Sequence, residues 1–369
     1  MISKKFCSRK YKNLSNFIIL SFFLFSITSC NKNNPQYNNP IAYITNQNGN
    51  LQILSLKDFK IINEVFVGDG ARGIGITPDG KTLAIAVRES NDLALVDTKT
   101  FEVRKRIFIG QNPEFVRVKD DKAFVSFEPA AIGGPPPKPG SKEAEELKQK
   151  REEDDEQPAR IAIVDLNLEE KISEIQGGME TEGIEFSRDG SKLIVTNEAD
   201  ENLSVHEIST GNLITKIDTS NYGNRPRGIK RSPTDNFYVA TIEYGDRILK
   251  ISEDFKIIQN AKTGAVPYGI SFTKNGEYIF VALSKGKVIQ VFDAKSLKPV
   301  REISTGNRCW HFSFTPDEKH IVVACGRSNE ILLIETESGK LINKFSNQNM
   351  PWGVVTYPKS MGSLDLPKI

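Results

Sequence analysis

A charged or aromatic residue recurs at one fixed place in seven similar segments of the chain. The next position, called the glycine slot, is glycine in five of the seven segments. A short apolar run follows the glycine slot in each segment. The seven residues are Arg72, Glu114, Glu182, Arg227, Tyr268, Trp310 and Trp352. Two guanidinium groups, two carboxylates and three aromatic rings could together bind an anionic or zwitterionic ligand that stacks on aromatic faces, or a peptide. Alternatively, they balance charge and pack against one another.

The sixth glycine slot holds His311 instead, two residues after Cys309. A histidine and a thiol at this spacing could bind a metal ion or haem iron, or His311 could pack beside Trp310. A zinc site needs a further donor that the sequence does not place, so no metal site is predicted. Cys309 and Cys325 could form a disulfide in an oxidising compartment, although one hairpin register would put them on opposite faces. No Cys-x-x-Cys-His motif occurs, which excludes covalently attached c-type haem.

The seven segments form an internal repeat of about forty residues. When the residue after each slot serves as anchor, the intervals between copies are 42, 68, 45, 41, 42 and 42 residues. A repeat of this period indicates a propeller or a solenoid. The clearest copy contains four short apolar strands, at 73–76, 83–87, 93–97 and 103–109, with tight-turn residues between the first two and no stretch of helical period. Four-stranded antiparallel units of this kind predict the blades of a β-propeller.

The two ends of the repeat complete each other. Residues 41–45 match a second strand, whereas residues 353–357 match a first strand. The C-terminus should therefore supply the missing strand of the first blade, which removes two open sheet edges. We predict an all-β, seven-bladed propeller over 41–357, followed by a tail at 358–369.

Several segments carry a resemblance to known propellers. Residues 78–85 (PDGKTLAI), 92–100 (DLALVDTKT), Asn112-Pro113 and 266–269 (VPYG) resemble the YVTN-repeat β-propellers of secreted and periplasmic bacterial proteins. The last unit, from Trp310 to 351–355 (PWGVV), is similar to propellers grouped with cytochrome-d1-type domains and with quinoprotein catabolic systems. The resemblance implies the fold, while one fold hosts unrelated functions.

The N-terminus predicts export and lipid attachment. Residues 1–29 hold five basic and no acidic residues, and an apolar stretch at 17–27 is too short to span a bilayer. This stretch ends at Ile27-Thr-Ser-Cys30, which looks like a bacterial lipobox with Cys30 as the lipidated residue. Residues 30–40 would then form a flexible tether, and the domain would face the periplasm or the cell exterior. The alternative is an uncleaved anchor with an incidental cysteine.

The charge of the mature chain argues against nucleic-acid binding. Removing the five basic residues of 1–29 leaves 49 − 5 = 44 Lys and Arg against 47 Asp and Glu, a net charge of about −3. Such a domain lacks the bulk positive charge that drives binding to nucleic acid. The expected partners are the membrane, through the lipid, and a small ligand or an envelope protein.

One interval is long because the third blade carries an insertion at 128–159, with 68 − 42 = 26 extra residues. Residues 133–139 are rich in proline and residues 142–156 are almost wholly charged, which predicts a mobile or marginally helical loop. The insertion is either a tolerated surface loop or a flap. It joins a second to a third strand, so it should project from the same face as the links between blades.

Two functions follow from these observations. The first is a non-catalytic binding scaffold that uses the seven recurrent residues, and His311 with them, at the mouth of a central channel. The second is a redox or cofactor-associated propeller, in which the channel mouth holds a haem or a quinone and His311 is its ligand or a proton donor. No nucleophile, base and orienting group form a hydrolase pattern, so an enzyme is the less expected class, and the sequence assigns no cofactor.

Overall fold

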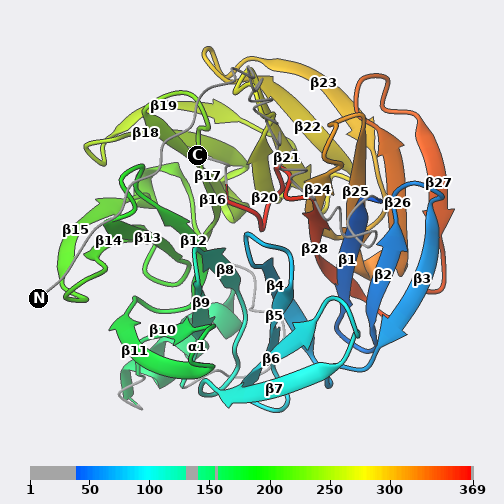
Figure 1. Ribbon diagram of the computed structural model, residues 1–369. Helices are drawn as coiled ribbons and strands as arrows, with labels where there is room; N and C mark the ends of the chain where they lie inside the picture. Colours follow the sequence, from blue (N-terminus) through cyan, green and yellow to red (C-terminus); the bar gives the residue numbers. More distant parts are fainter. Residues whose placement is uncertain (1–38, 130–139, 154–156, 367–369) are drawn as a thin grey trace, which may run out of the picture. The chain divides into compact units, whose positions relative to one another are not determined.

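The computed structural model describes residues 39–129, 140–153 and 157–366. Within them, strands form seven four-stranded antiparallel sheets, and Figure 1 shows these sheets as blades around a common centre. The predicted seven-bladed β-propeller is therefore confirmed. The predicted signal peptide at 1–29, the lipidation site Cys30 and most of the tether lie outside the described residues.

Each blade runs from an innermost first strand to an outermost fourth strand. In this order the blades are β28 (Pro351–Tyr357), β1 (Ile41–Asn46), β2 (Leu51–Ser55) and β3 (Lys60–Val65); β4 (Ala71–Ile76), β5 (Thr82–Val87), β6 (Asp92–Asp97) and β7 (Val103–Phe108); β8 (Val116–Lys119), β9 (Lys122–Phe127), β10 (Arg160–Asp165) and β11 (Glu170–Gln176); β12 (Thr181–Phe186), β13 (Lys192–Asn197), β14 (Asn202–Glu207) and β15 (Leu213–Asp218); β16 (Pro226–Arg231), β17 (Phe237–Ile242), β18 (Arg247–Ser252) and β19 (Ile257–Lys262); β20 (Pro267–Phe272), β21 (Tyr278–Leu283), β22 (Val288–Asp293) and β23 (Pro299–Ser304); β24 (Cys309–Phe314), β25 (His320–Cys325), β26 (Glu330–Glu335) and β27 (Leu341–Phe345).

Burial decreases from the centre of the ring outward. Every residue of β5 is buried, as are five of the six residues of β4, because both strands are covered by the neighbouring blades. In the fourth strand of the same blade, β7, most side chains are exposed. The apolar runs of the sequence therefore fill the interfaces between blades, and the charged fourth strands face water.

The ring closes where the two ends of the repeat meet. Strand β28 pairs antiparallel with β1, and Ile41 lies opposite Tyr357 while Ile44 lies opposite Val354. The C-terminus thus supplies the first strand of the first blade, as the repeat pattern predicted.

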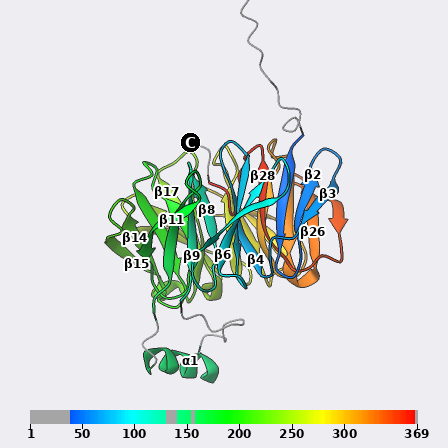
Figure 2. The ribbon, with the colours of Figure 1, turned by 60° about the horizontal axis from the view of Figure 1, so that its bottom comes forward.

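The insertion of the third blade contains a helix, α1 (Lys142–Glu153), which Figure 2 shows beyond one end of that blade. The Ser141 hydroxyl accepts the Ala144 N–H at 3.2 Å, as a helix N-cap does. The strands on either side pair directly, with Phe127 opposite Arg160, so the insertion leaves the blade intact. Among the described residues, no helix has the length and apolar character needed to span a bilayer.

The C-terminal tail enters the centre of the ring, which the sequence did not predict. After β28 the chain turns back, and its red trace runs to the middle of Figure 1. Gly362 forms a β-bridge with Ser313 of β24, and the Ser363 N–H donates to Phe312 O at 2.9 Å. Met361 and Leu364 are 3% and 1% exposed. The tail is therefore a packed part of the propeller.

Candidate functional site at the channel mouth

The structure places the seven recurrent residues at, or just before, the start of the seven innermost strands. We call this end of the ring, where the links between blades arrive, the channel mouth. Arg72 is partly exposed, and the other six residues are buried. These six are Glu114, Glu182, Arg227, Tyr268, Trp310 and Trp352.

A residue with left-handed backbone conformation precedes each of the seven mouth residues. Two positions before each mouth residue the backbone has φ between 50° and 77°, although glycine occupies this position in one blade alone. In six blades the carbonyl of this residue accepts the N–H that follows the second strand of the same blade, as in Glu198 N–H to Glu180 O and Glu243 N–H to Arg225 O, both 2.9 Å. In the third blade the carbonyl of Gln111 accepts the corresponding N–H of Glu128 at 3.0 Å. These hydrogen bonds attach each link between blades to the blade that follows it. The mouth residue, two positions later, lies near the axis of the ring.

The repeated glycine slot is explained by close approach between blades. A Cβ on Gly73 would lie 2.4 Å from the carbonyl oxygen of Glu114, and one on Gly228 would lie 2.4 Å from that of Tyr268. The backbones of neighbouring first strands touch there, so a side chain cannot point between them. Phe115 and His311 replace the glycine in the third and seventh blades.

Arg227 is the centre of an ion-pair network. Its Nε lies 2.6 Å from Glu198 and 2.9 Å from Glu243, and its Nη1 pairs with Glu182. The same Nη1 donates to the Tyr268 hydroxyl at 2.9 Å, and the guanidinium lies 4.4 Å from the centre of that ring. Four partners hold this cation, because a buried guanidinium is stable only when its donors and its charge are both matched.

Arg225 extends the network toward solvent. It pairs with Glu180 at 2.8 Å and with Glu243 at 3.2 Å, and it also contacts Glu198. Glu198 and Glu243 each follow the mouth residue of their blade by 16 residues, at the end of the second strand. Both carboxylates belong to the ion-pair network, and neither is among the residues predicted from the sequence. The identical offset in two neighbouring blades is the sequence signal that indicates them.

The second and third blades add the ion pair between Arg72 and Glu114. Together the mouth holds three arginines, Arg72, Arg225 and Arg227, against five glutamates, Glu114, Glu180, Glu182, Glu198 and Glu243. Burial raises the pKa of Glu182 to about 7, which Arg227 opposes and Glu114 reinforces. Glu182 is therefore protonated part of the time near neutral pH, and the cluster is acidic when fully ionised.

Two tryptophans form the other side of the mouth. The indole of Trp310 packs directly against Gly326. A Cβ at position 326 would lie 1.7 Å from the indole, so no larger residue fits there. Cys309 and Cys325 lie directly opposite each other in β24 and β25 and form a disulfide with a Cα–Cα distance of 3.8 Å. Trp352 is 2% exposed and its ring centroid lies 4.3 Å from that of His311.

His311 is a buried, neutral side chain in an aromatic setting. Its ring lies 5.5 Å from Tyr268 and 6.2 Å from Phe115, and its Nδ1 is 3.0 Å from Ser363 Oγ of the tail. Burial, and then the nearby cation Arg117, lower the pKa of His311 well below its usual value. Its Nε2 has no hydrogen-bond partner within the described part of the chain. In that part, no group of three or more His, Cys, Asp or Glu side chains is arranged to hold a metal ion.

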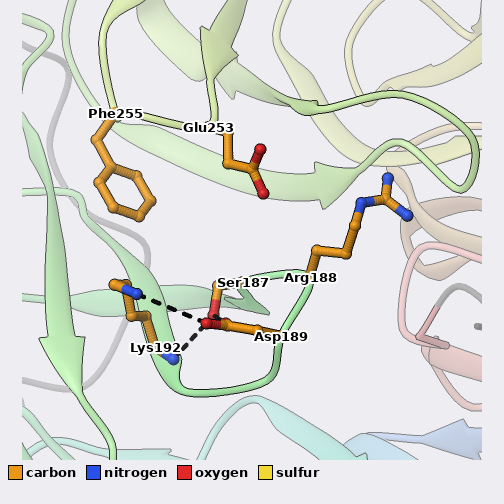
Figure 3. A pocket seen from close by; sticks show the side chains of 6 residues that line it. All are labelled: Ser187, Arg188, Asp189, Lys192, Glu253 and Phe255. Atoms are coloured by element: carbon orange, nitrogen blue, oxygen red, sulfur yellow. Dashed lines mark hydrogen bonds and ion pairs between the residues drawn. The ribbon is translucent and has the colours of Figure 1, made fainter.

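A cleft of about 280 Å³ lies elsewhere, between the fourth and fifth blades (Figure 3). It is lined by Ser187, Arg188, Asp189, Lys192, Glu253 and Phe255. Asp189 accepts hydrogen bonds from the Ser187 hydroxyl at 2.5 Å and from the Ser191 N–H at 3.1 Å. These bonds, the one from the Ser187 side chain first, lower the pKa of Asp189 to about 2. Asp189 therefore stabilises the turn, and the cleft shows no set of groups suited to catalysis.

Comparison with known proteins identifies related folds. The model of the family "Cytochrome D1 heme domain" matches residues 156–308, which is less than half of the chain. The match ends before Trp310, His311 and Trp352. No curated protein matches the chain significantly.

Solved structures with the same fold belong to proteins with different activities. Hydrazine synthase of Kuenenia stuttgartiensis has a TM-score of 0.64 at 18% identity, covering 80% of this chain and 92% of that one. A putative 6-phosphogluconolactonase from Bacteroides uniformis has a TM-score of 0.67 at 14% identity, covering 86% and 99%. The dihydro-heme d1 dehydrogenase NirN, in complex with DHE, has a TM-score of 0.60 at 15% identity, covering 86% and 75%. These identities show the fold alone, and this fold hosts unrelated chemistries.

The residues at the mouth do not fit a haem as they stand. His311 Nε2 is unpaired, but the ring is 3% exposed and lies against Trp352, Tyr268 and the tail. Arg72 and Arg227, which could pair with the carboxylates of a tetrapyrrole, are already paired with glutamates. A bound haem would have to displace these contacts.

Proposed function

We propose that this protein is a binding propeller of the bacterial cell envelope, held at a membrane by a lipid on Cys30. It engages a small ligand or an envelope protein at the channel mouth and catalyses no reaction. One observation supports the binding role most. Charged side chains from four blades and aromatic side chains from the other three converge on this end of the ring, while the chain's own tail fills the centre.

The excess of carboxylates at the channel mouth determines which charge a ligand should carry. Five glutamates against three arginines favour a ligand with a cationic group, and the partly exposed Arg72 leaves room for a zwitterion. A simple anion would meet a carboxylate excess. The side chains of Arg72 and Glu180, which are 18% and 17% exposed, are the charged groups that such a ligand reaches first.

Capture from native envelope extracts tests the proposal. The chain from residue 30 onward serves as bait, with Arg72→Gln and Glu180→Gln as variants and Lys105→Gln on an outer strand as the matched control. Each charge contact should be worth about a tenfold loss of capture, because charge-assisted contacts carry recognition. The control should capture as the wild type does. Unchanged capture by both variants, at unchanged melting temperature, would remove the mouth from consideration.

A second candidate function is a cofactor-associated propeller. The match to the "Cytochrome D1 heme domain" model and the unpaired Nε2 of His311 favour it. In that case, protein purified from its native host would show a visible absorption band that His311→Ala abolishes. A colourless wild-type protein, or a band unaffected by the substitution, would count against a haem on His311.

A further inference from the structure

Two buried cations meet at one uncharged group inside the ring. Arg117 lies on β8, three residues after the mouth residue Glu114. Lys230 lies on β16, three residues after the mouth residue Arg227. They are 1% and 0% exposed. Arg117 Nη1 donates to the main-chain carbonyl of Asp365 at 3.0 Å, and Lys230 Nζ donates to the same oxygen. A peptide carbonyl is neutral, so this contact satisfies donors without balancing charge.

The remaining hydrogen bonds of Arg117 also end on neutral groups. Its Nε donates to Ile184 O at 2.9 Å, and its Nη1 reaches Ser363 O at 3.3 Å. Its Nη2 has no hydrogen-bond partner in the described parts of the chain. A fully buried guanidinium nitrogen without an acceptor is costly, which indicates that an acceptor belongs there.

Two carboxylates, Glu185 and Asp365, lie near both cations, and other groups donate hydrogen bonds to them. Glu185, 0% exposed, accepts the Phe186 N–H at 2.9 Å and the Arg231 N–H at 3.2 Å. The Asp365 carboxylate accepts the Ser313 hydroxyl at 3.2 Å.

The tail contributes one more cation, the half-buried Lys359, and His311 nearby is neutral. Around Lys230, three cations (Arg117, Lys230, Lys359) therefore face two carboxylates (Glu185, Asp365), an excess of 3 − 2 = 1 positive charge.

We propose that a small monovalent anion of the halide class binds beside the Asp365 carbonyl, held by Arg117 Nη2 and the Lys230 ammonium group. Arg117 has an unpartnered Nη2, Lys230 contacts the same carbonyl oxygen as Arg117, and one negative charge would cancel the excess. A halide suits this place because it needs only N–H donors, and the tail residues Ser363 and Asp365 already contact these two cations. The competing state is an uncharged Lys230 with no anion.

Bromide locates the site directly. Crystals of the mature chain grown without halide are soaked in sodium bromide, and anomalous diffraction is recorded at the bromine edge. We expect a peak within hydrogen-bonding distance of Arg117 Nη2 and Lys230 Nζ. Absence of a peak inside the ring would overturn the proposal.

Thermal unfolding tests whether the anion matters in solution. At constant ionic strength, replacing gluconate by about 100 mM chloride should raise the melting temperature of the wild type by at least about 2 °C, since a ligand bound to the folded state stabilises it. Lys230→Met should lose both this shift and the bromide peak. Lys105→Met, on the exposed strand β7, should keep both.

A shift retained in Lys230→Met would place the chloride effect elsewhere and contradict the assignment. A bromide peak without any chloride-dependent shift in the wild type would mean binding at crystal concentration only, and would also overturn it.

Discussion

The ring centroids of Phe115 and His311 lie 6.2 Å apart, although the two residues belong to the third and seventh blades. They are the two residues that replace the repeated glycine. Five glycines let neighbouring first strands approach closely, and the two exceptions send side chains to the axis, where they meet each other and the C-terminal tail. Phe115 and His311, the two residues that differ from the repeat, therefore pack at the centre of the propeller.

Truncating Phe115 should therefore destabilise the whole ring. Phe115 is 5% exposed and contacts His311, so Phe115→Ala should cost about 3–5 kcal/mol in the free energy of unfolding. Phe108, which is 69% exposed on β7, is the matched control, and Phe108→Ala should change that free energy by less than about 0.5 kcal/mol. Urea denaturation measures both. Equal effects would mean that the centre is not packed.

The tail should contribute as a core element does. Leu364 is 1% exposed, and Leu364→Ala should cost about 2–4 kcal/mol in the free energy of unfolding. Leu168 is 65% exposed, so Leu168→Ala should be nearly neutral. The same denaturation assay applies. A Leu364→Ala protein as stable as the wild type would show that the tail does not pack at the axis in solution.

Glu182 should make stability depend on pH. Its pKa in the folded state is about 7, above the ordinary value of 4.5, so between these two values the folded state binds more protons than the unfolded state. Stability from this group is therefore greatest below pH 4.5 and is lost as pH rises toward about 7.

Glu182→Gln mimics the protonated form and should remove that loss. From pH 5 to pH 8, the stability of the variant relative to the wild type should rise by on the order of 1–3 kcal/mol. Glu102→Gln, at an exposed position, should show no such trend. A pH-independent difference for Glu182→Gln would mean that Glu182 is ionised throughout this range.

The insertion should be dispensable for folding. Replacing residues 135–157 by a short Gly-Ser link should change the free energy of unfolding by less than about 1 kcal/mol, because loop length costs stability slowly and Phe127 already pairs with Arg160. Thermal and urea unfolding of the shortened protein measure this. Loss of folding would show that the segment packs as structure.

Cys30 should determine membrane attachment. Cys30→Ala removes the predicted lipid, so the protein should leave the membrane fraction or accumulate as an unprocessed precursor. Fractionation with mass analysis of the N-terminus decides between these. Membrane retention of a processed Cys30→Ala protein would refute the lipoprotein prediction.

Much of the mouth was predictable because it repeats. The fixed place of Arg72 or Tyr268 before a glycine slot is a local pattern, and every link between blades repeats the same backbone geometry. The charge partners were harder to find. Glu198 and Glu243 lie 16 residues after their mouth residues, and contacts between blades bring them to the same arginines.

The sequence by itself determined the seven blades, their length and the closure by 353–357, because apolar alternation and turn residues recur with one period. The tertiary structure alone decided the register that joins Cys309 to Cys325 and the entry of the tail. It also decided the meeting of Arg117 with Lys230 at Asp365. These contacts join residues of different strands and blades, many of them far apart along the chain, and no local pattern encodes a contact that exists only after the ring has closed.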